Sequence, residues 1–167
     1  MVMNKKIILI IIVAVSAFAV HYSTRADSDT REVLRRFQQA SDALEKEPGE
    51  TNFAMMRKAQ DFSAVLAPTC TLRFPGTPLS GTYSAREAGQ TTAQLRMHLD
   101  SLTVAFTDIE IEFHDNNTAL ATASGTARGK THAGETFSET RELRCRLERI
   151  DGSFLFVECE AVEILRR

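Results

Sequence analysis

The sequence predicts an α+β domain whose helices precede an antiparallel sheet. Apolar residues recur at helical spacing in three segments before position 100. From Leu102 onward, apolar and polar residues alternate with period two, which is typical of half-buried strands, and polar turns divide this part into four strands. Residues 29–167 are numerous enough to bury a core of their own, so we expect one domain there.

Capping residues and prolines bound the first two helices. Asp29 and Glu32 have the spacing of a capping box, so the first helix is expected to begin there. Pro48 with the following glycine should stop it. The second helix is expected to begin at position 51 or 52 and to end at Pro68.

A short strand and a third helix follow. Cys70, Leu72 and Phe74 alternate with polar residues, which predicts a strand that ends at the next Pro-Gly, with Cys70 buried in the core. Ser84 and Glu87 form a second capping box, and the helix that they open should run to about position 100.

The four later strands are joined by hairpins. The apolar parity switches between Phe106 and Ile109, so a β-bulge is expected near Thr107-Asp108. The remaining strands are expected over residues 118–128, 137–149 and 154–165.

The register of the last hairpin places two cysteines together. Apolar positions face each other only if three residues, 151–153, form the turn. Cys145 then lies directly opposite Cys159. Both a disulfide and a pair of buried thiols fit this placement.

The amino terminus resembles an export segment. Lys5 and Lys6 precede an uncharged apolar run over residues 7–20, and Ala17-Phe18-Ala19 offers a small-x-small cleavage pattern. Residues 1–22 are therefore a signal peptide or, if uncleaved, an apolar helix that anchors the chain through residues 7–22. Residues 23–28 form a polar linker. Either alternative exports the domain to the periplasm or to the extracytoplasmic face of an inner membrane.

Charge and motifs exclude several functions. With 20 Lys+Arg against 22 Asp+Glu and a pI near 6.1, the chain is not expected to bind nucleic acid. Gly129-Lys130-Thr131 lacks the upstream glycine and the following helix of a phosphate loop. No two of the four histidines lie within five residues of each other. We expect neither a metal nor a cofactor.

Glu139 and Arg141 continue the alternation of the apolar residues that follow them. If the strand is regular, a carboxylate and a guanidinium point toward the core side, where they would pair or line the mouth of a pocket. A bulge would instead turn both of them to solvent.

The order of elements resembles that of the nuclear transport factor 2-like superfamily, which includes SnoaL-like cyclases and ketosteroid isomerases. The resemblance covers residues 29–165, with Leu72-Arg73-Phe74-Pro75-Gly76 and Gly81-Thr82-Tyr83 as its characteristic loops. It implies a cone: a strongly curved sheet around three helices, with a pocket at the open end. It also implies a homodimer through the sheet.

The catalytic residues of the isomerase branch are not found. Members of that branch place a general-base Asp at the end of the first strand, where this chain has Phe74. They place an oxyanion-binding Tyr in the first helix, where this chain has Phe37. A phenyl ring neither accepts nor donates the proton, so no catalytic residue is assigned.

Three functions stay open. The first is a non-catalytic module that binds a small apolar or amphipathic ligand, or a protein partner. Its pocket candidates are Phe37, Phe62, Phe74, Tyr83, Glu139 and Arg141, although each Phe could equally be plain core. The second is a membrane-anchored scaffold subunit of an envelope complex. The third is a SnoaL-like isomerase, cyclase or hydrolase with an unrecognised acid–base residue.

Overall fold

A computed structural model of the chain describes residues 27–77 and 80–162. The chain divides into two units between Glu32 and Val33, and the fold below is that of the second unit. The predicted export segment, residues 1–22, and most of the predicted linker, residues 23–28, lie outside the described residues. Within the described residues, no helix has the length and apolar character needed to cross a membrane.

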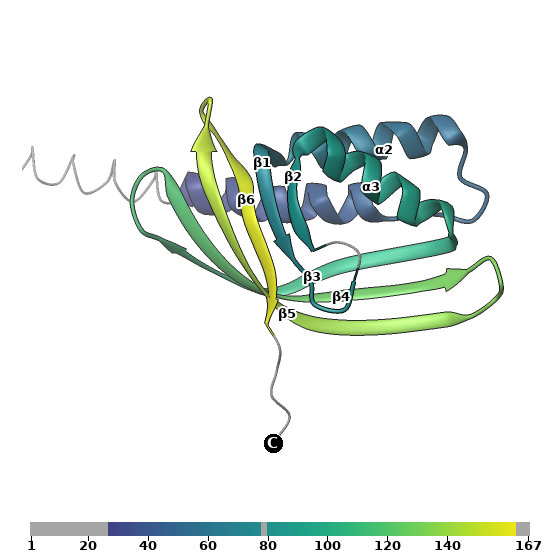
Figure 1. Cartoon of the computed structure of the whole chain (residues 1–167). Coiled ribbons are helices and arrows are strands. Elements are labelled where there is room, and N and C mark those ends of the chain that lie inside the picture. Colours follow the sequence, from purple (N-terminus) through teal and green to yellow (C-terminus); the bar gives the residue numbers. More distant parts are fainter. Residues whose placement is uncertain (1–26, 78–79, 163–167) are drawn as a thin grey trace, which may run out of the picture. The chain divides into compact units, whose positions relative to one another are not determined.

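Helices and strands follow one another in the predicted order (Figure 1). A first helix over residues 27–44 precedes α2 (Asn52–Ala64), and α3 (Ala85–Met97) lies between the short and the long strands. The strands are β1 (Leu66–Arg73), β2 (Gly81–Ser84), β3 (Leu99–Phe113), β4 (Thr118–Thr131), β5 (Thr136–Ile150) and β6 (Ser153–Val162). The predicted α+β fold is confirmed.

All six strands belong to one sheet in the order β2-β1-β6-β5-β4-β3. The sheet is mixed because β1 runs parallel to β6. The sequence had predicted an antiparallel sheet, so this part of the prediction is wrong. The chain leaves β1, passes through β2, α3 and the β3–β5 meander, and returns in β6 along the far side of β1. The long strands bend strongly (Figure 1).

Bulges accompany this bending. The β3–β4 register shifts between Thr107 and Glu110, and Asp108 there has a φ of 52°. This confirms the predicted bulge. A bulge adds one residue to a strand and increases its twist, which helps a sheet to curve around its helices.

The last hairpin differs from the prediction at its turn. Ile150 pairs with Ser153, so Asp151 and Gly152 form a two-residue turn, and both have the positive φ of a type I′ turn. A bulge in β6 after Phe156 then shifts the register. The predicted pairing of Cys145 with Cys159 is confirmed, but the three-residue turn is wrong.

The helix ends test the predicted caps. Ser84 and Glu87 form the capping box of α3, and Thr51 accepts a hydrogen bond from the Ala54 amide at the start of α2, as predicted. Asp29 does not cap the first helix, because residues 27 and 28 are already helical.

The second helix ends earlier than predicted. Leu66 and Pro68 belong to β1, and the β1–β6 pairing is irregular between Leu66 and Thr71. Proline fits at an irregularity because no ladder hydrogen bond is required of it there.

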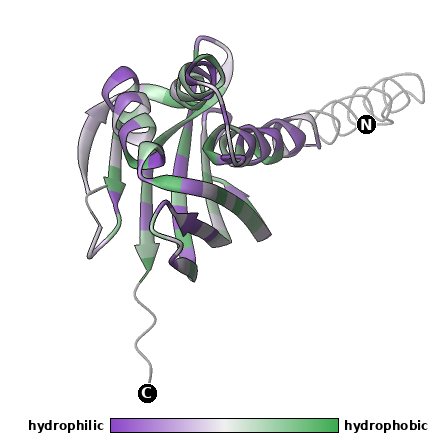
Figure 2. Ribbon diagram, turned by 90° about the vertical axis from the view of Figure 1, so that its right-hand side faces the viewer, coloured by the Kyte–Doolittle hydropathy of each residue, from purple (hydrophilic) through white to green (hydrophobic). Residues whose placement is uncertain are grey.

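The core lies between the helices and one face of the sheet. Hydrophobic and hydrophilic residues follow one another along the strands and helices (Figure 2). Phe37 of the first helix makes edge-to-face contacts with Phe106 and Phe156, at centroid distances of 5.4 and 5.0 Å. Small residues of β4, Ala119, Ala121 and Ala123, are buried beneath this cluster.

Candidate functional site

An apolar cavity of about 270 Å³ lies between α3 and the strands β3, β4 and β5. Most of its wall is hydrocarbon, from the side chains of Leu44, Phe74, Leu95, Leu99, Leu102, Val104, Phe106, Ala127 and Leu143. The polar residues of its wall are Thr77, Thr92, Arg96, Thr126, Glu139 and Arg141. Cavities of this composition suit small ligands with one or two polar groups.

A second cavity of about 120 Å³ adjoins the first, with which it shares Leu44, Phe74, Thr92, Phe106 and Leu143. Its wall adds Phe37 and Phe62 from the helices, Phe156 from β6, and both Cys145 and Cys159. Apolar space therefore continues from the first cavity toward the centre of the core.

Glu139 and Arg141 lie at the solvent-exposed end of the larger cavity. Arg141 Nε donates to Glu139 Oε1 at 2.7 Å, and Arg141 Nη1 donates to the Pro75 carbonyl at 3.0 Å. The Glu139 side chain is 56% exposed and that of Arg141 is 32% exposed. The pair therefore ties β5 to the loop after β1 beside the opening.

Five of the six pocket residues named from the sequence line these two cavities: Phe37, Phe62, Phe74, Glu139 and Arg141. Tyr83 does not line either cavity. It lies in β2, where its ring packs against the core cluster and close to Gly81.

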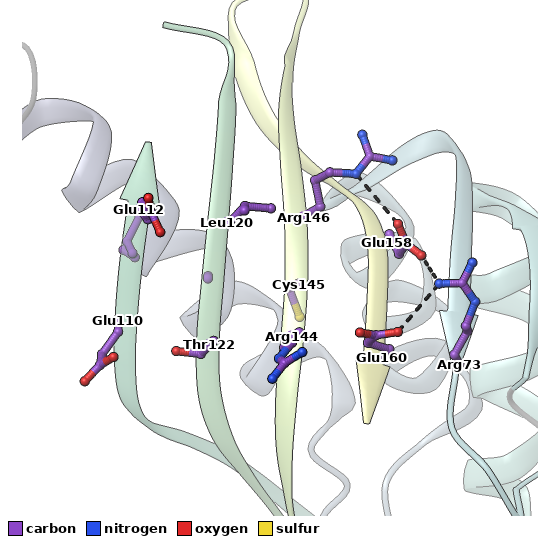
Figure 3. A pocket seen from close by; sticks show the side chains of 12 residues that line it. Arg73, Glu110, Glu112, Leu120, Thr122, Arg144, Cys145, Arg146, Glu158 and Glu160 are labelled. Atoms are coloured by element: carbon purple, nitrogen blue, oxygen red, sulfur yellow. Dashed lines mark hydrogen bonds and ion pairs between the residues drawn. The ribbon is translucent and has the colours of Figure 1, made fainter. Parts of the chain in front are cut away.

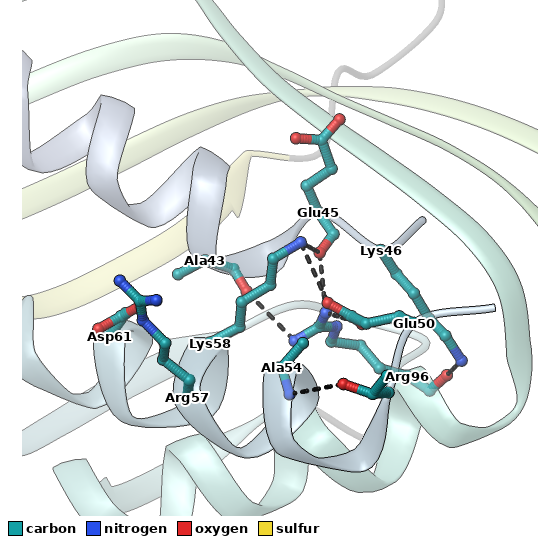
Figure 4. Close-up of polar contacts among 10 residues, drawn as sticks. Ala43, Glu45, Lys46, Glu50, Ala54, Arg57, Lys58, Asp61 and Arg96 are labelled. Atoms are coloured by element: carbon teal, nitrogen blue, oxygen red, sulfur yellow. Dashed lines mark hydrogen bonds and ion pairs between the residues drawn. The ribbon is translucent and has the colours of Figure 1, made fainter. Parts of the chain in front are cut away.

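A buried polar cluster stands at the C-terminal end of α3 (Figure 4). Arg96 is 1% exposed, and its Nη2 lies 2.5 Å from Glu50 Oε2. The same guanidinium donates to the Glu45 carbonyl at 2.8 Å and to the Ala43 carbonyl at 3.4 Å. Arg96 thereby fixes the connection between the first helix and α2 onto α3.

Two lysines complete this cluster. Lys58 Nζ lies 3.1 Å from Glu50 Oε1. Lys46 Nζ donates to the carbonyls of Arg96 and Leu99, at 2.8 and 2.5 Å, and so satisfies backbone acceptors at the end of α3.

Sequence reasoning missed Arg96, although a signal was present. Ala88, Gly89, Thr92 and Arg96 are the buried residues of α3, and they recur at spacings of three and four. This periodicity alone places Arg96 on the side of α3 that faces the protein.

The described cavity walls hold no acid–base pair. Glu139 is the only carboxylate in these walls, and it already pairs with Arg141. No histidine lines either cavity. No group of three or more potential metal ligands occurs among the described residues.

The cysteines divide into a bonded pair and a buried thiol. Cys145 and Cys159 are joined by a disulfide in the structure, with their Cα atoms 4.2 Å apart. Cys70 is fully buried. Burial, and secondarily the charge of Glu158, raises the pKa of the Cys70 thiol to about 11, so it is protonated and unreactive near neutral pH.

A concavity of about 610 Å³ lies on the outer face of the sheet (Figure 3). Charged side chains line it, and Arg73 bonds Glu158 and lies 3.6 Å from Glu160. Arg146 lies 3.7 Å from Glu158. This is a solvated, ion-paired surface, and the cavity on the other face, whose wall is mostly apolar, is the better candidate for a ligand site.

Solved structures of low sequence identity share this fold. A hexachlorocyclohexane dehydrochlorinase, LinA-type3 from Novosphingobium barchaimii, aligns over 84% of this chain and 89% of its own, with 10% identity and a TM-score of 0.68. The Kfla4162 protein from Kribbella flavida aligns over 82% and 91%, with 14% identity and a TM-score of 0.69.

A protein of the nuclear transport factor 2-like family from Streptomyces avermitilis aligns over 84% of this chain and 99% of its own, with 15% identity and a TM-score of 0.61. No protein-family model and no curated protein sequence matches the chain. The chain therefore has the nuclear transport factor 2-like fold, as its sequence resemblance implied.

Proposed function

We propose that the domain binds a small apolar or amphipathic compound in the cavity of about 270 Å³ and releases it unchanged. The observation that carries this proposal is a concave hydrocarbon wall interrupted by a few polar groups. Apolar ligand surface gains roughly 25 cal/mol for each Å² that leaves water, so a ligand that fills such a space is stabilised mainly by burial.

The composition of the wall supports binding without catalysis. Proton abstraction needs a base within hydrogen-bond reach of the substrate. The one carboxylate available, Glu139, is more than half exposed and is held by Arg141. No histidine lines either cavity among the described residues.

The proposal includes export. The sequence of residues 1–22 supports it, since basic residues precede an apolar run and a small-x-small site. Fractionation of cells that produce the full chain tests this part. Recovery in the cytoplasm with an intact amino terminus would contradict export and leave the binding proposal standing.

Toluene is a suitable first probe for the cavity, because it is apolar and smaller than the available volume. We expect it to bind the wild-type protein in a titration followed by NMR. Ala127 lines the cavity, so Ala127→Phe should fill it and abolish binding. Arg128 is its exposed neighbour, and Arg128→Met should leave binding unchanged.

Circular dichroism must show that each variant is folded. Val104→Phe provides a second way to fill the same cavity should Ala127→Phe fail to fold. Absence of toluene binding by the folded wild type, or equal binding by a folded cavity-filled variant, would refute the proposal.

A further inference from the structure

Arg96 has one hydrogen-bond donor that the protein leaves unused. Its two Nη atoms bond the Ala43 and Glu45 carbonyls and the Glu50 carboxylate, but its Nε is buried and has no hydrogen-bond partner. A buried donor without an acceptor typically costs about 1–3 kcal/mol. Native proteins retain few such groups, and Arg96 is one of the residues that line the apolar cavity.

Thr92 is a second polar side chain on the same wall. Thr92 is 6% exposed and lines both cavities. Its hydroxyl forms no hydrogen bond within the described part of the chain. Thr92 and Arg96 are four residues apart on α3, so their side chains lie one above the other on the same face of the helix. The Thr92 hydroxyl is therefore an unused donor in a wall that is otherwise mostly hydrocarbon, and the unused Arg96 Nε lies one helical turn away, beneath the surface of that wall.

The charge around Arg96 is unbalanced. Three cationic side chains, Lys46, Lys58 and Arg96, are bonded in the cluster, and the single carboxylate among their bonded partners is that of Glu50. Glu45 contributes only its carbonyl, and its carboxylate points away from the cluster (Figure 4). Of these three cations only Arg96 lines the cavity, and because a buried cation is stabilised by a nearby anion, its part of the wall favours a negative ligand group.

We propose that the ligand is a small apolar carboxylate whose head group accepts a hydrogen bond from the Thr92 hydroxyl and, after a small shift of the Arg96 side chain that uncovers its Nε, a second one from Arg96. Its hydrocarbon part lies against Leu95, Leu99 and Leu102. This inference rests on the proposed binding function and adds the chemical class of the ligand to it. Arg141 lies at the opening and already pairs with Glu139, so it does not compete with Arg96 for the carboxylate of the ligand.

Three probes of one shape test the head group: benzoate, benzyl alcohol and toluene, each titrated into the wild-type protein by calorimetry at neutral pH. We expect benzoate to bind about tenfold more tightly than either of the others, because hydrogen bonds to a charged group typically contribute about 1.5–3 kcal/mol. Equal binding of the three would overturn the inference while leaving the cavity as a binding site. Tighter binding of benzyl alcohol than of benzoate would also overturn it.

Thr92→Val removes the hydroxyl with little change in size. It should weaken benzoate binding about fivefold and leave toluene binding unchanged. Arg96→Lys keeps the charge but removes the Nε donor, and it should weaken benzoate about tenfold or more, again without effect on toluene. Arg57→Gln serves as the matched control, since Arg57 pairs with Asp61 in an exposed position away from this wall.

The toluene titration separates the proposed binding function of the cavity from the inference that its ligand is a carboxylate. A folded variant that loses toluene and benzoate equally has lost the cavity and counts against a head-group role for its residue. If Thr92→Val and Arg96→Lys both retain full benzoate affinity, the inference is wrong. If the wild type binds none of the three probes, the proposed function fails as well.

Discussion

The two faces of the sheet use the same strands for opposite purposes. Along residues 143–148 of β5, the odd positions are buried leucines and a cysteine, while the even positions carry charged side chains that are exposed or only partly buried. The inner face encloses apolar cavities, and the outer face spreads ion pairs over a solvated concavity. Period-two alternation alone separates these environments, so a single strand supplies both a ligand wall and a charged surface.

Ion pairs on the two sides differ in the same way. Arg96 and Glu50 have side chains that are 1% and 5% exposed, whereas Arg73 of the outer face is 56% exposed. Water screens the exposed ion pair strongly and the buried pair only weakly. Breaking the buried pair should therefore lower stability more than breaking the exposed one.

The largest expected effect concerns the aromatic centre of the inner face. Phe37→Ala removes a ring that is 2% exposed and contacts Phe106 and Phe156, so it should lower the free energy of unfolding by about 4 kcal/mol. Chemical denaturation measures this loss. Phe53 is 79% exposed, and Phe53→Ala should change stability by less than about 0.5 kcal/mol. Similar losses in both variants would mean that burial does not distinguish the two positions.

The buried ion pair should give the next largest effect. Glu50→Gln leaves the Arg96 guanidinium without its carboxylate in a buried site, and we expect a loss of about 3 kcal/mol by the same measurement. Asp61→Asn breaks the exposed pair with Arg57 and provides the control, with an expected change below about 0.5 kcal/mol. A loss below about 1 kcal/mol for Glu50→Gln would show that the cluster is solvated.

The sequence predicts those features that local chemistry determines. The Ser84–Glu87 capping box needs only its own four residues, and the parity switch after Phe106 is sufficient to locate the bulge in β3. The pairing of Cys145 with Cys159 was predicted from the alternation of apolar residues around them, although the structure reaches it through a two-residue turn and a bulge in β6.

Features that depend on distant packing could not be predicted in the same way. The bulge in β6 lets Phe154 and Phe156 lie in the core, whereas a regular strand after the predicted three-residue turn would turn both rings to the face opposite Cys159. Burying two phenyl rings stabilises the fold more than a regular β-ladder would. The gain depends on the rest of the core that surrounds the rings, so the local sequence does not predict the bulge. The Arg96 cluster likewise needs the connection over residues 45–50 to fold back over α3.

The disulfide is the third prediction. Mass spectrometry of the unreduced protein should show Cys145 and Cys159 oxidised and Cys70 free. Cys145 and Cys159 are separated by 14 positions, and reduction of their bond should lower stability by about 2 kcal/mol, less than a free loop would lose because the hairpin already restrains the two strands. Two free thiols at positions 145 and 159 would contradict the prediction.

Cys70 makes stability depend on alkaline pH. Its thiol has a pKa of about 11 in the folded protein and an ordinary value near 9 when unfolded. Between these values the folded state binds more protons, so stability falls as pH rises from about 9 to about 11, with a loss of about 1 kcal/mol at pH 10. Cys70→Ala should flatten this part of the profile relative to the wild type. Identical profiles would show that the buried thiol ionises freely.

The smallest effect is expected on the outer face. Arg73→Met removes a guanidinium that bonds Glu158 and lies near Glu160, yet these carboxylates remain open to water. Surface pairs of this kind contribute roughly 0–1 kcal/mol, so the stability loss should stay below about 1 kcal/mol and shrink further at high salt. Toluene binding should be unchanged, because Arg73 lines only the outer concavity. A loss as large as that of Glu50→Gln, or a change in toluene affinity, would mean that the two faces are coupled through β1 and β6 rather than separated by the sheet.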